Sequence, residues 1–188
     1  TIGFKIKKYN KNRKNVVVLD REPEYEFVST GTEKLKNRPV IVGFGPAGMF
    51  CGYMLAMYGY KPIIVERGSK VEQRLKKIEE FWSTGKLDEN SNVQFGEGGA
   101  GTFSDGKLNT GIKDKENRIN LVLKTFVENG AKENILYDAK PHVGTDILSV
   151  VVKNMRKYIE SKGGTFYFDT EMTLSLIHIS EPTRLRRN

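Results

Sequence analysis

The amino-acid sequence predicts an α/β domain with a parallel sheet, and three observations in one stretch support this prediction. Residues 40–42 (V-I-V) are a short apolar run of the kind that forms a buried parallel strand. Glycines at the spacing G-x-G-x-x-G follow at once, and residues 46–58 can form a helix. A second apolar run at 63–65 then ends in an acidic residue. Together these features predict a βαβ unit with a dinucleotide fingerprint.

Each residue of the fingerprint has a separate physical task. Gly43 permits the tight turn out of the strand, Gly45 has no Cβ to keep the backbone away from a pyrophosphate, and Gly48 allows close packing of helix on strand. Pro46 suits a first helical turn because its missing N–H would have no partner there. The remaining amides of that turn, including that of Ala47, then face the phosphates together with the positive end of the helix dipole.

Charged residues after the second strand extend the predicted site. Glu66 lies a little more than 20 residues beyond Gly43, where an acidic side chain accepts hydrogen bonds from ribose hydroxyls. Arg67 could attract a 2′-phosphate, which the neighbouring Glu66 opposes. Arg74 is close enough in sequence to reach a phosphate, but an ordinary solvent-exposed arginine is an equal alternative.

The composition limits the classes of protein. The chain has 188 residues, enough for one domain of ordinary size, and it begins at Thr1 rather than Met, so we expect a fragment or a processed product. The longest mostly apolar stretch, 49–58, is too short to span a bilayer, and no signal peptide is visible. These two observations predict a cytoplasmic protein that is not inserted in a membrane. Cys51 is the one cysteine, which excludes a disulfide or a C-x-x-C pair within the chain, and we expect it in the core.

The net charge of +8 suits an anionic partner, but much of it lies at the two ends of the chain. No aromatic interleaving or base-reading module accompanies the charge. We therefore favour a solvated basic arm over nucleic-acid binding.

Further elements are predicted in chain order. Residues 2–7 and 16–19 read as two strands of an accessory domain whose earlier part is missing. Ser69 and Glu72 form a capping box for a helix that ends at Gly85. The apolar face expected for that helix consists of Val71, Leu75, Ile78 and Trp82.

A glycine-rich stretch at 91–110 is the second informative segment. Five glycines in so short a span are incompatible with a regular helix or strand, so such a loop is either disordered or pressed against a ligand. Apolar anchors within it favour ligand contact over a mobile surface loop. Its backbone amides, together with the hydroxyls of Thr102 and Ser104, suit a pyrophosphate or the polar edge of a flavin.

The remaining pattern predicts helices at 116–130 and 146–161, a short helical turn within 131–137, and a strand at 165–170. Thr145 is the expected N-cap of the long helix, whose core face is Leu148, Val151, Val152, Met155 and Ile159. His142 precedes this helix without a visible partner, and we assign it no catalytic role. No Cys/His cluster suggests a metal.

The end of the chain differs in character. Residues 174–184, L-S-L-I-H-I-S-E-P-T-R, resemble the in-frame translation of a transposon-end adapter used in sequencing libraries. We therefore expect 174–188 to be an artefactual tail, and His178 is not counted as a functional residue.

Three motifs carry a family resemblance: V-G-F-G-P-A-G with V-E-R-G, then N-V-Q-F-G-E-G-G-A-G-T-F-S-D-G-K-L-N-T, then I-L-Y-D-A-K-P-H-V-G-T-D. From about Arg38 to Met172 the chain resembles FAD-dependent dehydrogenases of unassigned substrate, the NAD(FAD)-utilizing type among the glutathione-reductase-like flavoproteins. The middle motif is far more specific than the fingerprint.

The resemblance implies FAD, with NAD(P)H as a possible electron donor and a small-molecule substrate. It implies that Gly43, Gly45, Pro46, Ala47 and Gly48 hold the pyrophosphate and Glu66 the adenosine ribose. The loop of Gly99, Ala100, Gly101, Thr102 and Ser104 would serve the pyrophosphate or the flavin, and the backbone near Met172 the adenine. Members of the family are considerably longer, so we expect an N-terminal part that is inactive alone.

The sequence therefore predicts a three-layer, Rossmann-like FAD-binding domain over 38–173, with a glycine-rich loop and a helical insertion. It follows an accessory remnant at 1–37 and precedes the tail at 174–188. The predicted function is that of an FAD-dependent oxidoreductase. The alternatives are an NAD(P)-binding Rossmann dehydrogenase and an RNA-associated flavoprotein that uses its basic N-terminal surface.

Overall fold

The structure is a computed structural model that describes residues 25–27, 31–32, 34–104, 106–108 and 110–173. The strands predicted at 2–7 and 16–19, and the tail at 174–188, lie outside the described residues.

Three short parallel strands form the sheet, in the order β1 (Val40–Val42), β2 (Ile63–Val65) and β3 (Thr165–Tyr167). Val40 pairs with Ile63, which pairs with Thr165. β3 is shorter than predicted because the chain turns away after Tyr167, where Asp169 has a positive φ of 50°. The predicted α/β class and the Rossmann-like alternation of parallel strands and helices are confirmed.

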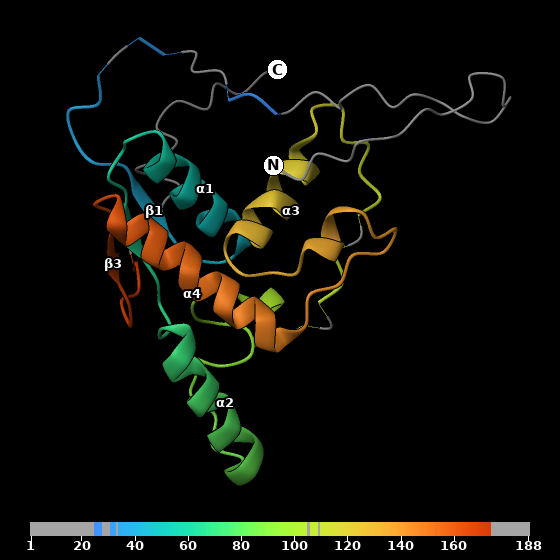
Figure 1. Cartoon of the computed structure of the whole chain (residues 1–188). Helices are drawn as coiled ribbons and strands as arrows, with labels where there is room; N and C mark the ends of the chain where they lie inside the picture. The colour runs from blue at the N-terminus through green and yellow to red at the C-terminus, as the bar shows by residue number, and fades with distance from the viewer. Residues whose placement is uncertain (1–24, 28–30, 33, 105, 109, 174–188) are drawn as a thin grey trace, which may run out of the picture.

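Two helices, α1 (Pro46–Met57) and α4 (Thr145–Ser161), lie side by side against the sheet (Figure 1). A Cβ on Gly52 of α1 would lie 3.3 Å from Ile159 of α4 and 3.5 Å from Ile41 of β1. The rings of Tyr53 and Tyr158 stack at 4.4 Å between the two helices. The core face predicted for α4 is buried as expected: Leu148, Val151, Val152, Met155 and Ile159.

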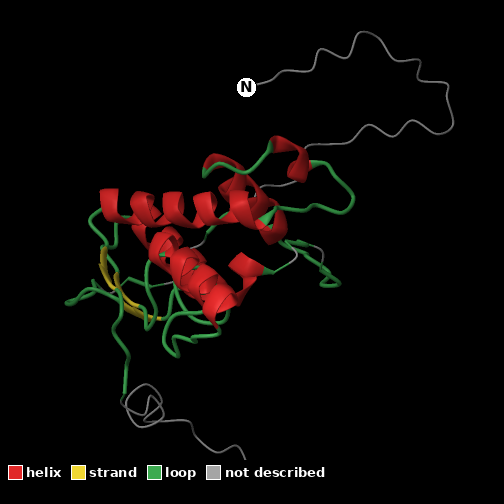
Figure 2. Cartoon of the chain, turned by 90° about the horizontal axis from the view of Figure 1, so that it is seen from below, coloured by secondary structure: helices red, strands yellow, loops and turns green. Residues whose placement is uncertain are grey.

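The opposite face of the sheet is open among the described residues. Val40, Val42 and Tyr167 alternate onto that face and are 61%, 45% and 53% exposed. The described residues therefore form two layers, with the strands along one margin of the molecule in Figure 2, and the third layer stays a prediction.

Cys51 is exposed, so its prediction as a core residue was wrong. The buried positions of α1 are Met49, Gly52, Tyr53 and Ala56. At about 100° per residue, position 51 falls on the opposite side of the helix from these residues.

The helix α2 (Val71–Thr84) extends away from the sheet (Figure 1) and ends at Gly85 in the left-handed region, as predicted. The predicted capping box is wrong, because Lys70 is the N-cap residue and no side chain of the cap bonds the helix. The predicted apolar face is half right. Val71 and Ile78 are buried, whereas Leu75 and Trp82 are exposed.

The remaining elements are α3 (Arg118–Glu128), the 3-10 helix η1 (Ala100–Phe103) and the 3-10 helix η2 (Glu133–Leu136). Both helices predicted within 116–137 are thus present. The N-cap of α4 is Gly144 rather than Thr145, which is the first helical residue. No helix within the described ranges is long and apolar enough to cross a membrane.

Candidate functional site

The turn between β1 and α1 needs two of its three glycines for its own geometry. Gly43 has a φ of +87°, and its amide donates to the Val65 carbonyl at 2.7 Å. A Cβ on Gly48 would overlap the Gly43 carbonyl oxygen and lie 3.0 Å from the Gly43 carbonyl carbon. These two glycines are explained by the tight turn and by close packing.

Neither the tight turn nor close packing explains the glycine at position 45. Its φ of −76° is open to any residue, and the atom nearest to an added Cβ is the Gly99 Cα at 3.9 Å, an ordinary contact. Gly45 is also the N-cap of α1, Pro46 begins the helix, and no side chain caps it. Among the described residues, the amides of Ala47 and Gly48 donate to no group outside the helix. The start of α1 therefore presents unpaired donors beside space that a side chain at 45 would fill.

Glu66 directly follows β2 next to this turn and is buried. One carboxylate oxygen accepts from the Phe44 amide at 2.6 Å and the other from the Gly68 amide at 2.9 Å. Glu66 thus fastens the end of β2 to the β1–α1 turn. A carboxylate has about four acceptor positions, so further lone pairs remain for the ribose contact that the sequence predicts.

The chain after β3 returns to the same place. The Asp169 amide donates to the Gly68 carbonyl at 3.1 Å, and the Thr170 amide donates to the Glu66 carbonyl at 3.1 Å. Met172, predicted to adjoin the adenine, follows two residues later and is partly exposed. The segment predicted to meet the adenine is therefore joined to the residue predicted to meet the ribose.

The glycine-rich loop packs on the β1–α1 turn. The Gly98 amide donates to the Phe44 carbonyl at 2.8 Å. Gly99 has a φ of +67°, and a Cβ there would lie 3.0 Å from the Gly45 Cα and 3.1 Å from the Pro46 Cδ. A Cβ on Gly101 would lie 4.0 Å from the Pro46 Cγ. Two motifs more than 50 residues apart in the sequence thus line one site.

The rest of the loop forms η1, which begins at Ala100. The Thr102 hydroxyl is buried and has no hydrogen-bond partner among the described residues. The Ser104 hydroxyl is engaged within the loop, since it donates to the Gly101 carbonyl at 2.9 Å. Of the two predicted hydroxyls, only that of Thr102 is unpaired, and it lies against Gly98.

Arg74 holds the glycine-rich loop from within. Its guanidinium is fully buried, which excludes the solvent-exposed alternative. It donates to the carbonyl oxygens of Asn92, Val93, Glu97 and Gly99 at 2.7 to 2.9 Å, and more weakly to that of Gly96. Burial lowers the pKa of Arg74 to about 10, while Glu66 and Glu97 oppose that shift. The predicted phosphate contact stays a prediction; the contacts in the structure go to the loop.

Glu97 is a buried site residue that the sequence analysis missed. Its carboxylate accepts from the Val71 amide at 2.6 Å and from the Arg156 Nε at 2.7 Å. It therefore caps α2 from a distant loop, which explains how that helix begins without a local cap. Burial raises the pKa of Glu97 to about 7, against the lowering effect of the Val71 amide and of Arg156.

Arg67, the candidate for a 2′-phosphate, is engaged elsewhere. Its guanidinium lies 3.6 Å from the centre of the Phe95 ring and 3.7 Å from the Glu171 carboxylate. Both partners lie in segments that surround Glu66, so Arg67 joins the loop to the chain after β3.

His142 pairs with Lys107 in an antiparallel bridge. The Val143 amide donates to the Gly106 carbonyl at 2.9 Å, and the Leu108 amide donates to the Pro141 carbonyl at 3.0 Å. The middle and last motifs of the family resemblance thus contact each other through backbone bonds.

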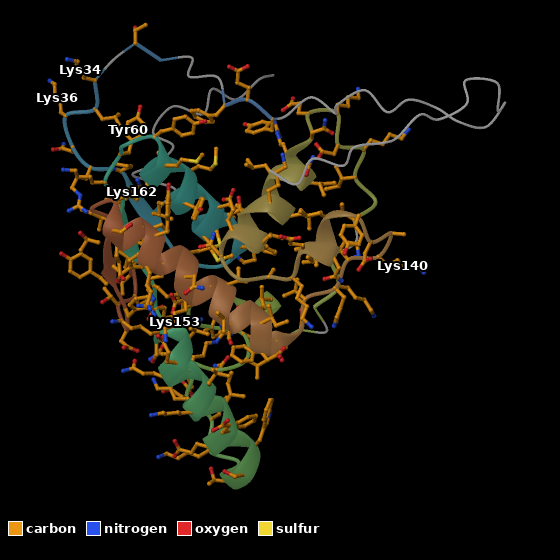
Figure 3. The ribbon with its side chains drawn as sticks, in the orientation of Figure 1. Lys34, Lys36, Tyr60, Lys140, Lys153 and Lys162 are labelled. Atoms are coloured by element: carbon orange, nitrogen blue, oxygen red, sulfur yellow. The ribbon has the colours of Figure 1, made fainter. Side chains whose placement is uncertain are left out.

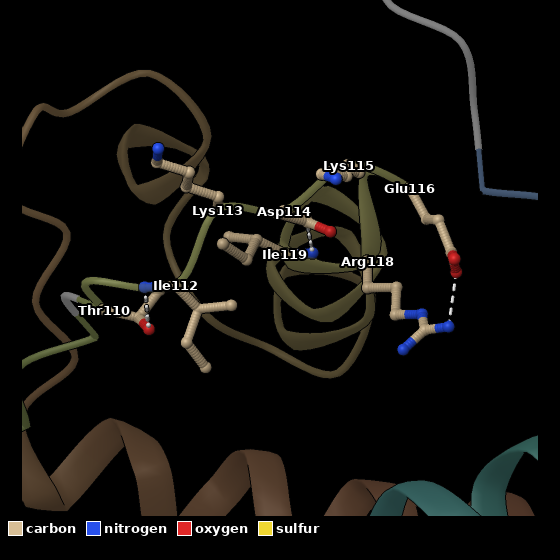
Figure 4. A pocket seen from close by; sticks show the side chains of 8 residues that line it. All are labelled: Thr110, Ile112, Lys113, Asp114, Lys115, Glu116, Arg118 and Ile119. Atoms are coloured by element: carbon tan, nitrogen blue, oxygen red, sulfur yellow. Dashed lines mark hydrogen bonds and ion pairs between the residues drawn. The ribbon is translucent and has the colours of Figure 1, made fainter.

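The two larger cavities in the described part of the chain lie away from this site. One, of about 380 Å³, adjoins the start of α3, where Asp114 accepts from the Ile119 amide at 2.6 Å and Arg118 pairs with Glu116 (Figure 4). The Ile119 hydrogen bond lowers the pKa of Asp114. The Asp114 bond satisfies an amide in the first turn of α3.

The other cavity, of about 400 Å³, lies at the amino-terminal ends of the strands. Of the described residues that line it, none is acidic and four are cationic: Lys34, Lys36, Arg38 and Lys61. Arg38 is fixed by donating to carbonyls that include that of Lys61, at 2.6 Å. Tyr60 lies nearby, and Lys162 shares this side of the molecule (Figure 3).

No protein-family model matches the chain. The chain is similar to an uncharacterized protein of Clostridium beijerinckii, with 53% identity over 149 residues. The match covers 79% of this chain and 28% of that relative. The chain thus spans little more than a quarter of the length of this relative.

Proposed function

We propose that this chain is the dinucleotide-binding part of an FAD-dependent oxidoreductase. The observation that best supports the proposal is the glycine at position 45. The fold requires no glycine there, whereas a diphosphate approaching the unpaired amides of Ala47 and Gly48 does require one.

The arrangement around Gly45 supports a ligand of dinucleotide length. Glu66 lies at the end of the next strand, where a ribose is recognised in such folds, and the Thr170–Met172 segment lies beyond it. The glycine-rich loop lies on the other side of Gly45. Pyrophosphate at the helix start would therefore have its adenosine toward Glu66 and its other half toward the loop.

The resemblance stated above favours FAD over a nicotinamide dinucleotide. Arg67 speaks against NADP in particular, because its guanidinium is stacked on Phe95 and paired with Glu171 rather than placed for a 2′-phosphate. A bound flavin would supply the capacity to accept hydride or single electrons. This chain would bind the diphosphate through main-chain amides, orient the ribose through Glu66 and cover the cofactor with the loop.

Calorimetric titration of the purified chain with FAD, NAD⁺ and NADP⁺ tests the proposal. We expect saturable binding of FAD that is at least tenfold tighter than that of either nicotinamide. Binding of NADP⁺ without FAD would favour the nicotinamide dehydrogenase. Binding of none of the three would contradict the proposal.

A second candidate, association of the flavoprotein with RNA, draws on the cationic cavity at the other end of the sheet. Binding of single-stranded RNA that weakens steeply with salt would support it, since phosphate contacts release counterions. Reversing two charges, with Lys36→Glu and Lys61→Glu, should then abolish retention. Absence of retention of the wild-type chain at low salt would remove this candidate.

A further inference from the structure

The loop residue Glu97 lies between two helices and the proposed dinucleotide site. On its N-terminal side, Gly96 approaches Arg74, and a Cβ at Gly96 would lie 2.6 Å from the Arg74 Cδ. On its C-terminal side, Gly98 and Gly99 contact the β1–α1 turn through the Gly98 bond to Phe44 and the approach to Gly45. The position of Glu97 therefore sets where the two following glycines lie.

Four hydrogen bonds fix Glu97 at that position, one of them from Arg74 to its carbonyl at 2.8 Å. Its amide donates to the Ser69 carbonyl at 3.1 Å. Its carboxylate accepts from the Val71 amide and from Arg156, whose side chain is 7% exposed. A carboxylate buried in this way is held only by such donors, because water does not reach it.

Arg156 is itself fixed from its other side. Its Nη2 donates to both carboxylate oxygens of Glu72, at 2.9 and 3.0 Å. Lys153, labelled in Figure 3, pairs with Glu72 at 3.1 Å, and Glu160 approaches Arg156 at 3.9 Å. A network of ion pairs therefore joins α4 to α2. The guanidinium joins α4 to Glu97 on the loop and to Glu72 on α2.

We propose that Glu97 is a positioning residue of the dinucleotide site, which with Arg156 holds the Gly98–Gly99 peptide against the start of α1. This inference rests on the proposed function. Glu97 reaches the ligand through the loop backbone and not with its own carboxylate, which faces Val71 and Arg156.

Gly98 leaves no room to shift the loop inward, since a Cβ there would overlap the Thr102 hydroxyl and lie 3.1 Å from Val152. Loss of the Glu97 contacts therefore moves the loop outward, away from α4. The Gly98 bond to Phe44 then weakens, and with it the wall of the site beside Gly45.

The test compares Glu97→Gln, Arg156→Gln and the double variant by FAD titration. The amide of glutamine cannot accept from both donors, so we expect about tenfold weaker binding in each single variant. The double variant should be no weaker than the worse single one, because both act through one contact. Glu160→Gln is the matched control: it removes an exposed acid beside the same guanidinium and should change affinity less than twofold.

Hydrogen exchange separates positioning from general destabilisation. In Glu97→Gln, peptides covering 95–104 should exchange faster, while peptides covering 49–57 of α1 keep wild-type rates. If Arg156→Gln does not fold, Arg156→Lys retains the charge but not both bonds, and should show the same pattern at smaller size.

The outcomes of the test are distinct. If the wild-type chain binds FAD and Glu97→Gln binds it equally tightly, the inference is overturned while the proposed function stands. The same holds if Glu97→Gln speeds hydrogen exchange equally in both regions. A wild-type chain that binds no dinucleotide overturns the proposed function on which the inference rests.

Discussion

Two glycines of the same helix, Gly48 and Gly52, should respond to alanine to very different degrees. In an exposed helix alanine is favoured over glycine by about 1 kcal/mol, so propensity favours both changes. At Gly52 the new methyl would meet the ends of side chains, with Ile159 at 3.3 Å and Ile41 at 3.5 Å, which yield easily. At Gly48 it would overlap a backbone carbonyl oxygen, which yields only if the β1–α1 turn moves.

The expected sizes follow from these contacts. Overpacking costs about 1–3 kcal/mol, and a backbone obstacle belongs at the upper end of that range. Gly48→Ala should therefore be destabilised by about 2 kcal/mol net, and Gly52→Ala should stay within about 1 kcal/mol of wild type. With an m-value of about 2 kcal/mol/M in urea, the Gly48→Ala midpoint should fall by about 1 M.

Urea unfolding followed by far-ultraviolet circular dichroism measures both variants under identical conditions. Equal stability of Gly48→Ala and Gly52→Ala would refute the close turn at Gly43–Gly48 on which the site is built.

Three further predictions concern residues around the site. Arg74→Lys keeps the charge but cannot bond four carbonyls at once, so the free energy of unfolding should fall by about 2–3 kcal/mol. Hydrogen exchange of residues 92–99 should become faster, and unchanged exchange there would contradict the role of Arg74. The pKa of Glu97, raised from 4.5 to about 7 by burial, means that the folded chain holds this proton more tightly than the unfolded chain. Wild-type stability relative to Glu97→Gln should therefore be greatest below about pH 4.5 and fall by about 3 kcal/mol up to pH 7–8, and a flat difference in urea melts would refute this. Cys51, exposed on α1, should react fully with a thiol reagent in the native chain, and reaction only after denaturation would place it in the core instead.

The sequence was sufficient where local patterns decide the structure. The strand at Ile41, the fingerprint helix and the buried face of α4 follow from apolar periodicity and glycine spacing, and all are present. Cys51 and Trp82 were assigned wrongly to the core. Only tertiary packing reveals which side of α1 is covered and that the far end of α2 extends from the body.

The buried polar contacts of the site could not be predicted from local pattern. Arg74 bonds backbone carbonyls 18 to 25 residues away, and carbonyls carry no sequence signature. A weak signal existed, because Arg74 shares the helical spacing of the buried Val71 and Ile78. Glu97 likewise was the single charge within the run F-G-E-G-G-A-G. Its partner Arg156 lies 59 residues further on, and nothing local connects the two.

The most direct test of the account is to give position 45 a side chain. Gly45→Ala meets no atom closer than 3.9 Å and no positive φ, so its stability should fall by no more than about 1 kcal/mol, the usual cost of alanine at an N-cap. The control Gly111→Ala, which meets no atom within 4 Å, should match wild type. The methyl would occupy the space proposed for the diphosphate, and an overpacking cost of about 1–3 kcal/mol corresponds to FAD binding weaker by about 5- to 150-fold. We predict this loss of FAD affinity in Gly45→Ala and not in Gly111→Ala. Wild-type FAD affinity in a folded Gly45→Ala chain would contradict the central claim.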